Sequence, residues 1–169
     1  MAAHTDHELV IHAPLDLVWD ISNDLSRWPD LFQGHYAAAE ILEESPGRLR
    51  FRLTTCPDEQ GRTYSWVSER FLDVGRHRIL GRRIDPGPFL YMHIFQSFDQ
   101  VPDGTAVRWV HDFEMLPGGF PTDAEMAARI ERNAAANLRQ HKTVIESLAG
   151  PGTVGVLAAS SSRPATAHG

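Results

Sequence analysis

Alternating apolar and polar positions predict a run of β-strands between residues 37 and 115. The strand-like segments are rich in β-branched and aromatic residues, and short stretches of Pro, Gly, Asp and Ser separate them. Connections of this length join neighbouring antiparallel strands. We therefore expect a six-strand antiparallel meander over residues 37–44, 48–56, 62–72, 76–84, 89–100 and 105–115, joined by a first strand at Glu8–Ala13.

Helical spacing follows the first strand. Apolar residues three and four apart predict a short helix over Pro14–Asn23, and proline is accepted in a first helical turn. A second short helix is predicted to run through Phe32, with Ser26 as its N-cap.

A long helix is predicted after the strands. Thr122 and Glu125 form a capping box, and the helix is expected to run to about Leu148, before a Gly-Pro pair. Two asparagines and a histidine interrupt its apolar stripe. They are either tolerated near an edge or paired with backbone, or they belong to a polar cavity wall. The stripe reads Met126, Ile130, Asn133, Asn137, His141, Ile145 and Leu148.

This order of elements predicts an α+β fold. A seven-stranded, curved antiparallel sheet would hold the long C-terminal helix, with two short helices after the first strand. Such a sheet cannot close tightly on one helix everywhere, so we expect an interior cavity. Residues 1–149 are expected to form a single domain, and residues 150–169, rich in Gly, Ala, Ser and Pro, a flexible tail.

The segment Arg62–Phe71 has an unusual inward face for a strand. Alternation places Tyr64, Trp66, Ser68 and Arg70 on one side of it. A buried guanidinium needs hydrogen-bond partners or water, which a packed core does not offer. A wet cavity with aromatic walls would suit this face. The alternative is that Arg70 lies at a strand end and extends to solvent.

Composition narrows the function classes. The chain has 169 residues, 42% hydrophobic and 22% charged, with a formal net charge of −6, which argues against nucleic acid as a partner. The single cysteine, Cys56, favours a reducing compartment. No apolar run approaches the length of a membrane helix and no secretory leader is evident, so we expect a cytoplasmic protein with no membrane association.

Common catalytic motifs are missing from the sequence. We find no phosphate-binding glycine loop, no dinucleotide fingerprint, no HExxH and no G-x-S-x-G elbow. No metal site is predicted. Two classes of function remain: ligand binding, and chemistry that needs no cofactor.

The candidate inward groups combine flat rings with fixed hydrogen-bond donors. Aromatic side chains offer flat surfaces, and arginines offer rigid forks for oxygen atoms. Together they suit a planar, oxygen-rich, mostly carbon ligand such as a polyketone. The candidates are Trp28, Phe32, Tyr36, Tyr64, Trp66, Ser68, Arg70, Arg83, Met92, Asn133 and Asn137.

Several stretches of the chain resemble one family. They read HTDHELVIHAPLDLVWDISNDLSRWPDLF, PDEQGRTYSWVSER, GPFLYM, VRWVHDFEM and RNAAANLRQ. Over roughly residues 3–148 the chain is similar to the single-domain aromatase/cyclases of bacterial type II polyketide synthases, of the tetracenomycin and spore-pigment type. The chain departs from the pattern of this family at two places. It has one extra residue near Gln33–Tyr36, and it has Tyr64 where these relatives have tryptophan.

The resemblance implies a helix-grip (START-like) fold and a substrate. That substrate is a linear poly-β-ketone tethered to acyl carrier protein, made with a ketosynthase/chain-length factor. The implied reaction is aldol closure of a first ring between C9 and C14, often a second between C7 and C16, then dehydration. No metal or cofactor is implied, and a homodimer is left open.

We assign site roles to these residues as hypotheses. Arg70 would polarise a carbonyl and stabilise the developing oxyanion. Proton removal is open between Tyr36, a water held by Ser68 and the substrate's own enol. Arg83 would anchor a ketone or the phosphate of the tether, and the shape of the cavity would come from Trp28, Phe32, Trp66 and Met92.

Two other readings compete with an enzyme. A non-catalytic carrier or chaperone of a hydrophobic polyketide or lipid would use the same fold, although it needs no arginines and hydroxyls at mid-cavity. A docking subunit of the synthase would act without cavity chemistry.

Overall fold

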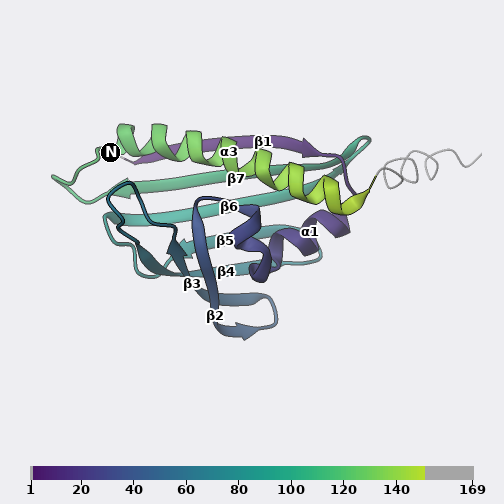
Figure 1. Ribbon diagram of the computed structural model, residues 1–169, viewed down its shortest axis with the longest axis horizontal. Coiled ribbons are helices and arrows are strands. Elements are labelled where there is room, and N and C mark those ends of the chain that lie inside the picture. Colours follow the sequence, from purple (N-terminus) through teal and green to yellow (C-terminus); the bar gives the residue numbers. More distant parts are fainter. Residues whose placement is uncertain (1, 151–169) are drawn as a thin grey trace, which may run out of the picture.

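The computed structural model describes residues 2–150, and the predicted tail lies almost wholly outside them. Its seven strands form one antiparallel sheet, as predicted, and the order of the strands is β1-β7-β6-β5-β4-β3-β2 (Figure 1). The strands are β1 (Ala3–Ile11), β2 (Tyr36–Ser45), β3 (Arg48–Thr55), β4 (Ser65–Asp73), β5 (Arg78–Arg83), β6 (Phe89–Val101) and β7 (Gly104–Met115).

β1 begins earlier than predicted. It pairs with β7 from Ala3 to Ile11, whereas the sequence indicated a start at Glu8. Its first half is polar, and its polar groups find partners on both faces of the sheet. The Asp6 carboxylate accepts a hydrogen bond from Nε of Arg108 on β7 at 2.8 Å, and His7 contacts Glu131 of the long C-terminal helix. Cross-strand charge pairing therefore extends a strand that hydrophobic alternation alone does not reveal.

The two predicted short helices are present in modified form. α1 (Leu15–Asn23) starts after Pro14, as expected. The N-cap prediction for Ser26 is wrong: the Asp24 side chain caps the segment by accepting a hydrogen bond from the Ser26 N–H at 3.1 Å. A 3₁₀ turn, Leu25–Arg27, leads into α2 (Trp28–Leu31), which has Pro29 in its first turn, where a proline is tolerated.

α3 (Asp123–Ala149) is the long C-terminal helix, and its capping box between Thr122 and Glu125 is present. It runs along the sheet beside β1 and β7 and ends next to α1 (Figure 1). The predicted stripe fails at its end, where Leu148 is 49% exposed. Ala149, four positions after buried Ile145, packs against the core instead, in keeping with 3.6 residues per turn.

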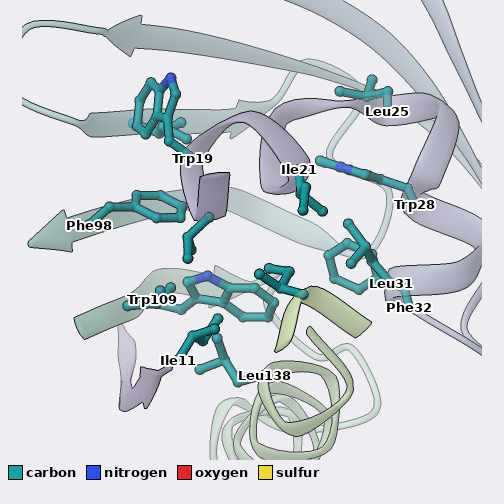
Figure 2. Close-up of a cluster of buried hydrophobic side chains, with 14 of the residues drawn as sticks. Ile11, Trp19, Ile21, Leu25, Trp28, Leu31, Phe32, Phe98, Trp109 and Leu138 are labelled. Carbon is teal, nitrogen blue, oxygen red and sulfur yellow. The ribbon is translucent and has the colours of Figure 1, made fainter. Parts of the chain in front are cut away.

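Two separate clusters of buried side chains fill the space between sheet and helices. The larger lies where α1 and α2 meet the sheet, and Figure 2 shows Trp19 of α1 beside Phe98 of β6, with their ring centres 5.2 Å apart. The smaller joins the start of β6 and the end of β7 to the N-terminal part of α3, and it consists of Phe89, Met92, Phe113, Met115 and Met126.

Candidate active site

A cavity of about 760 Å³ lies between the two clusters, under α3 and over the middle of the sheet. Side chains from both clusters form part of its wall, and the exposed residues Tyr64 and Phe120 line it as well, so the cavity reaches from the core to the surface. All eleven residues proposed from the sequence lie along it: Trp28, Phe32, Tyr36, Tyr64, Trp66, Ser68, Arg70, Arg83, Met92, Asn133 and Asn137. The roles given to them stay predictions.

β4 presents Trp66, Ser68 and Arg70 to this cavity. Register with β3 places each of them beside an inward apolar residue of that strand. Tyr64 does not belong to the strand, which begins at Ser65, because the β3–β4 connection is longer than predicted. Tyr64 is 51% exposed and lies at the mouth of the cavity.

Arg70 is buried, with 6% of its surface exposed, so it does not extend to bulk solvent. Its Nη2 donates to Oε1 of Gln96 at 2.6 Å, and its Cζ lies 5.2 Å from the centre of the Trp28 ring. Nη1 is buried and has no hydrogen-bond partner within residues 2–150. Burial lowers the pKa of Arg70 to about 10, so the guanidinium remains charged at neutral pH.

Arg83 is held between two rings. Its Cζ lies 3.9 Å from the centre of the Trp66 ring and 4.9 Å from that of Phe89. Burial lowers its pKa to about 10, against the attraction of Tyr36 and Asp85. Cation–π contacts of this kind fix a guanidinium while leaving its edge free for hydrogen bonds.

Tyr36 joins an aromatic group on the opposite wall. Its ring stacks on Trp28 at a centroid distance of 6.3 Å and meets Phe32 and Trp66 at 4.9 and 6.0 Å. Burial raises the pKa of Tyr36 to about 12, although the charge of Arg83 opposes this. The phenol is therefore protonated at neutral pH and is a hydrogen-bond donor to any ligand oxygen.

The helix contributes two amides and one arginine, Arg129, to the polar part of the wall. Asn133 and Asn137 are half-buried and line the cavity. His141, one turn on, is buried between the rings of Phe32 and Trp109, and its Nδ1 donates to the Asn137 carbonyl at 2.7 Å. The histidine of the predicted stripe is thus paired with the backbone, which is one of the alternatives that the sequence left open.

The cavity also has lining residues that the sequence did not reveal, among them three on the sheet with polar or aromatic side chains. Gln96 and Trp109 face it from β6 and β7, and His111 faces it from β7 with its Nδ1 3.1 Å from Oγ1 of Thr5. Burial lowers the pKa of His111 to about 4, so this imidazole is neutral. Their inward orientation follows from strand alternation, but only the pairing register shows that they reach the same space as Arg70.

The described residues contain no cluster of three or more His, Cys, Asp or Glu side chains that could hold a metal ion. Across residues 2–150, no helix is long and apolar enough to span a membrane.

Comparison with known proteins gives the class of this chain. It belongs to the polyketide cyclase/dehydrase and lipid transport family, whose profile matches residues 2–146. A relative from Streptomyces cyaneus, named "Putative polyketide cyclase", is 44% identical over 146 residues, which make up 86% of this chain and 95% of the relative. The resemblance seen in the sequence is confirmed at the level of the family.

Solved structures agree with this assignment. The Zhui aromatase/cyclase from Streptomyces sp. R1128 superimposes with a TM-score of 0.78 at 27% identity, over 90% of this chain and 98% of that protein. A START superfamily protein from Mycobacterium smegmatis, at 17% identity, has a TM-score of 0.62 over 86% of this chain and 96% of its own length. The second likeness concerns the fold alone, and the predicted helix-grip fold is confirmed.

Proposed function

We propose that this protein is an aromatase/cyclase that closes a ring in a poly-β-ketone by aldol condensation and then dehydrates it to the aromatic. The main support is the buried Arg70 guanidinium, which stands on the wall of a cavity that several aromatic rings line and has donors that no group within residues 2–150 uses. Unpaired buried donors are costly for the fold, so a ligand oxygen is the natural acceptor for them.

The aldol step forms a bond between an enol carbon and a carbonyl carbon of the same chain. The carbonyl oxygen gains negative charge as the bond forms, and Arg70 is placed to stabilise it. The oxygen then takes a proton, and loss of water gives the aromatic ring. Holding the two carbons in contact can contribute up to about 7–11 kcal/mol. That part of the task falls to the flat walls made by Trp28, Phe32 and Trp66.

The raised pKa of Tyr36 changes its proposed role. A phenol with a pKa of about 12 does not remove a proton from carbon at neutral pH, so we assign Tyr36 as a donor that protonates or holds a ketone oxygen. Proton removal is left to a water on Ser68, to the substrate's own enol, or to the neutral imidazole of His111, which lines the cavity.

The proposal extends to substrate and partners. The substrate is a poly-β-ketone on acyl carrier protein, supplied by a ketosynthase/chain-length factor in the cytoplasm, with first-ring closure between C9 and C14 and a second ring between C7 and C16. Arg83, which lies between Trp66 and Phe89, would hold a ketone or the phosphate of the tether. A homodimer remains compatible with this proposal.

Reconstitution with the cognate synthase tests the proposal. Arg70→Met should lower the yield of the first-ring product by about 10²–10³-fold, as for loss of an oxyanion donor. Arg52→Met is the matched control, because Arg52 is exposed and pairs with Glu40 away from the cavity. Wild-type yields from the folded Arg70 variant would exclude Arg70 from the chemistry. Identical ring closure without any protein would make the chain a carrier instead of an enzyme.

A further inference from the structure

Gln96 provides the hydrogen bond that holds the Arg70 side chain. Its Oε1 accepts from Nη2 of Arg70 at 2.6 Å, and within residues 2–150 the other guanidinium nitrogen at the fork, Nη1, has no partner. The Cζ of Arg70 lies over the Trp28 ring, 5.2 Å from its centre. A contact with a ring does not by itself set the direction of the N–H groups, so the hydrogen bond to Gln96 is what fixes them.

The sheet provides an open path between these two residues. Arg70 on β4 pairs with Gly81 on β5, and Gly81 pairs with Ile94 on β6. Because Gly81 has no side chain, nothing stands on the inward face of β5 at the position between Arg70 and β6. Gln96 faces inward two residues after Ile94, and the long Arg70 side chain crosses β5 to reach it.

The chemistry of Gln96 differs from the usual partner of a buried arginine. A carboxylate there would neutralise the guanidinium, as Glu69 does for the arginines on the other face. An amide oxygen accepts one hydrogen bond without cancelling the charge. The positive charge of Arg70 and its remaining N–H groups therefore stay available to a second, anionic partner.

We propose that Gln96 is the positioning residue of Arg70: its amide oxygen fixes the plane of the guanidinium across β5 while leaving the charge free for the oxyanion of the substrate. The effect on catalysis that we expect rests on the proposed function. The hydrogen bond between Gln96 and Arg70 does not depend on it. Because the guanidinium is rigid and planar, fixing Nη2 also fixes where the other N–H groups point.

Three substitutions separate positioning from packing. Gln96→Met keeps a similar volume among Ile79 and Trp109 but removes the acceptor. Gln96→Glu keeps an acceptor at the same reach but adds a neutralising charge. Gln96→Asn keeps the amide, but its side chain is one methylene too short to reach Arg70. It replaces Gln96→Met in the tests if the methionine variant fails to fold.

The first measurement is NMR of isotope-labelled arginine side chains in the full-length protein, with the Arg70 signal assigned by its loss in Arg70→Lys. We expect the wild type and Gln96→Glu to give separate, slowly exchanging Nη signals, and Gln96→Met and Gln96→Asn to give averaged ones. Ile94→Leu, which alters the same wall without touching the hydrogen bond, should keep them separate. Separate signals in Gln96→Met, or averaged signals in the wild type, would overturn the positioning role.

The second measurement is product formation in the reconstituted synthase. Gln96→Met should lower kcat by about 10²-fold with KM changed much less, because a misdirected donor affects the transition state more than binding. Gln96→Glu should keep the ring pattern of the wild type while turning over more slowly. Gln100→Met, the same substitution at an exposed position of β6, should match the wild type.

The NMR measurement and the product measurement can contradict the positioning role and the proposed function separately. If the wild type closes no ring, the proposed function is wrong and the NMR experiment alone decides whether Gln96 fixes Arg70. If the wild type closes the ring and Gln96→Met does so at the same rate, the positioning role is wrong while the proposed function stands.

Discussion

Glu69 and Arg70 are neighbours in β4 and place two buried, opposite charges on opposite faces of the sheet. The Glu69 carboxylate is 0% exposed and accepts hydrogen bonds from Nε and Nη2 of Arg82 at 3.0 and 2.8 Å and from Arg48. Arg70 lies on the cavity side. A charge network on the outer face therefore anchors the part of β4 that presents the candidate catalytic guanidinium.

We expect Glu69→Gln to destabilise the protein by about 1.5–3 kcal/mol, the usual range for hydrogen bonds to a charged group. The arginines around it are partly exposed, and water can solvate them when the carboxylate is lost, which keeps the effect below that of a fully buried pair. Denaturant unfolding at neutral pH measures it. Glu43→Gln, which removes an exposed partner of Arg50, is the control and should stay close to the wild type.

The same variant has a pH signature. The hydrogen bond from Arg82, followed by that from Arg48, lowers the pKa of Glu69 despite its burial. A depressed folded-state pKa contributes stability above the unfolded-state pKa, and that stability is lost as pH falls through the folded value. The difference in free energy of unfolding between the wild type and Glu69→Gln should therefore become smaller at acid pH. A difference that grew would contradict the ion-pair account.

The fold could be predicted largely from the sequence because its signals are local. Turn residues separate the strands, and Thr122 with Glu125 marks the start of α3. The errors lie where tertiary contacts decide. The pair Asp6 and Arg108 extends β1, and Asp24 replaces Ser26 as a cap. Neither choice is visible in hydrophobic alternation.

The candidate site was predictable only in part. Arg70 stood out because a charged residue shared the inward face of a strand with Trp66. Gln96 and His111 gave no such signal, since a polar residue in an alternating strand is normally taken as solvent-facing. Their place beside the cavity depends on the register of β5, β6 and β7, which is set by long-range pairing.

The phenol of Tyr36 should ionise at a higher pH than that of an ordinary tyrosine. Burial raises its pKa to about 12, so its phenol should ionise well above the usual value near 10. The chain has 3 tyrosines, and alkaline titration of tyrosinate absorbance in wild type and Tyr36→Phe isolates this one. The difference between the two curves should be a single late step. A step near 10 would return Tyr36 to the list of candidate bases.

His141 should make stability depend on pH. Burial, with a smaller effect from the charge of Arg70, lowers its pKa to about 4, against about 6.5 in an unfolded chain. Between these values the unfolded state binds the extra proton, so stability falls as pH falls, by about 1 kcal/mol per pH unit. His111 has the same pKa of about 4 and adds a similar slope.

Replacing His141 isolates its share of that slope. His141→Gln should be less stable at neutral pH, because the bond to the Asn137 carbonyl and the contacts with Phe32 are disturbed. Between pH 6.5 and 4.5, however, its stability should change less than that of the wild type, as measured by urea unfolding at each pH. His93→Gln, at an exposed position, is the control. An unchanged slope in His141→Gln would mean that the imidazole is not buried in its neutral form.

Trp66 is expected to determine how the polyketone folds, because it performs two tasks at once. Its ring is part of the cavity wall and also supports Arg83, whose Cζ lies 3.9 Å from the ring centre. Trp66→Leu removes the flat surface and frees Arg83 to move. We expect a fall in the ratio of correct first-ring product to other cyclised products by about 10-fold, consistent with 1–2 kcal/mol for a cation–π contact and lost packing.

Product analysis in the reconstituted synthase measures that ratio, and Tyr91→Leu is the matched control. Tyr91 is aromatic and half-buried, but its ring packs on His93 and it does not line the cavity. A cavity that serves as a template should lose selectivity in Trp66→Leu while total turnover falls less, since Arg70 remains buried beside Trp28. If the distribution stays unchanged and only the rate drops, Trp66 contributes to binding alone, and the ring pattern must be set by the substrate itself.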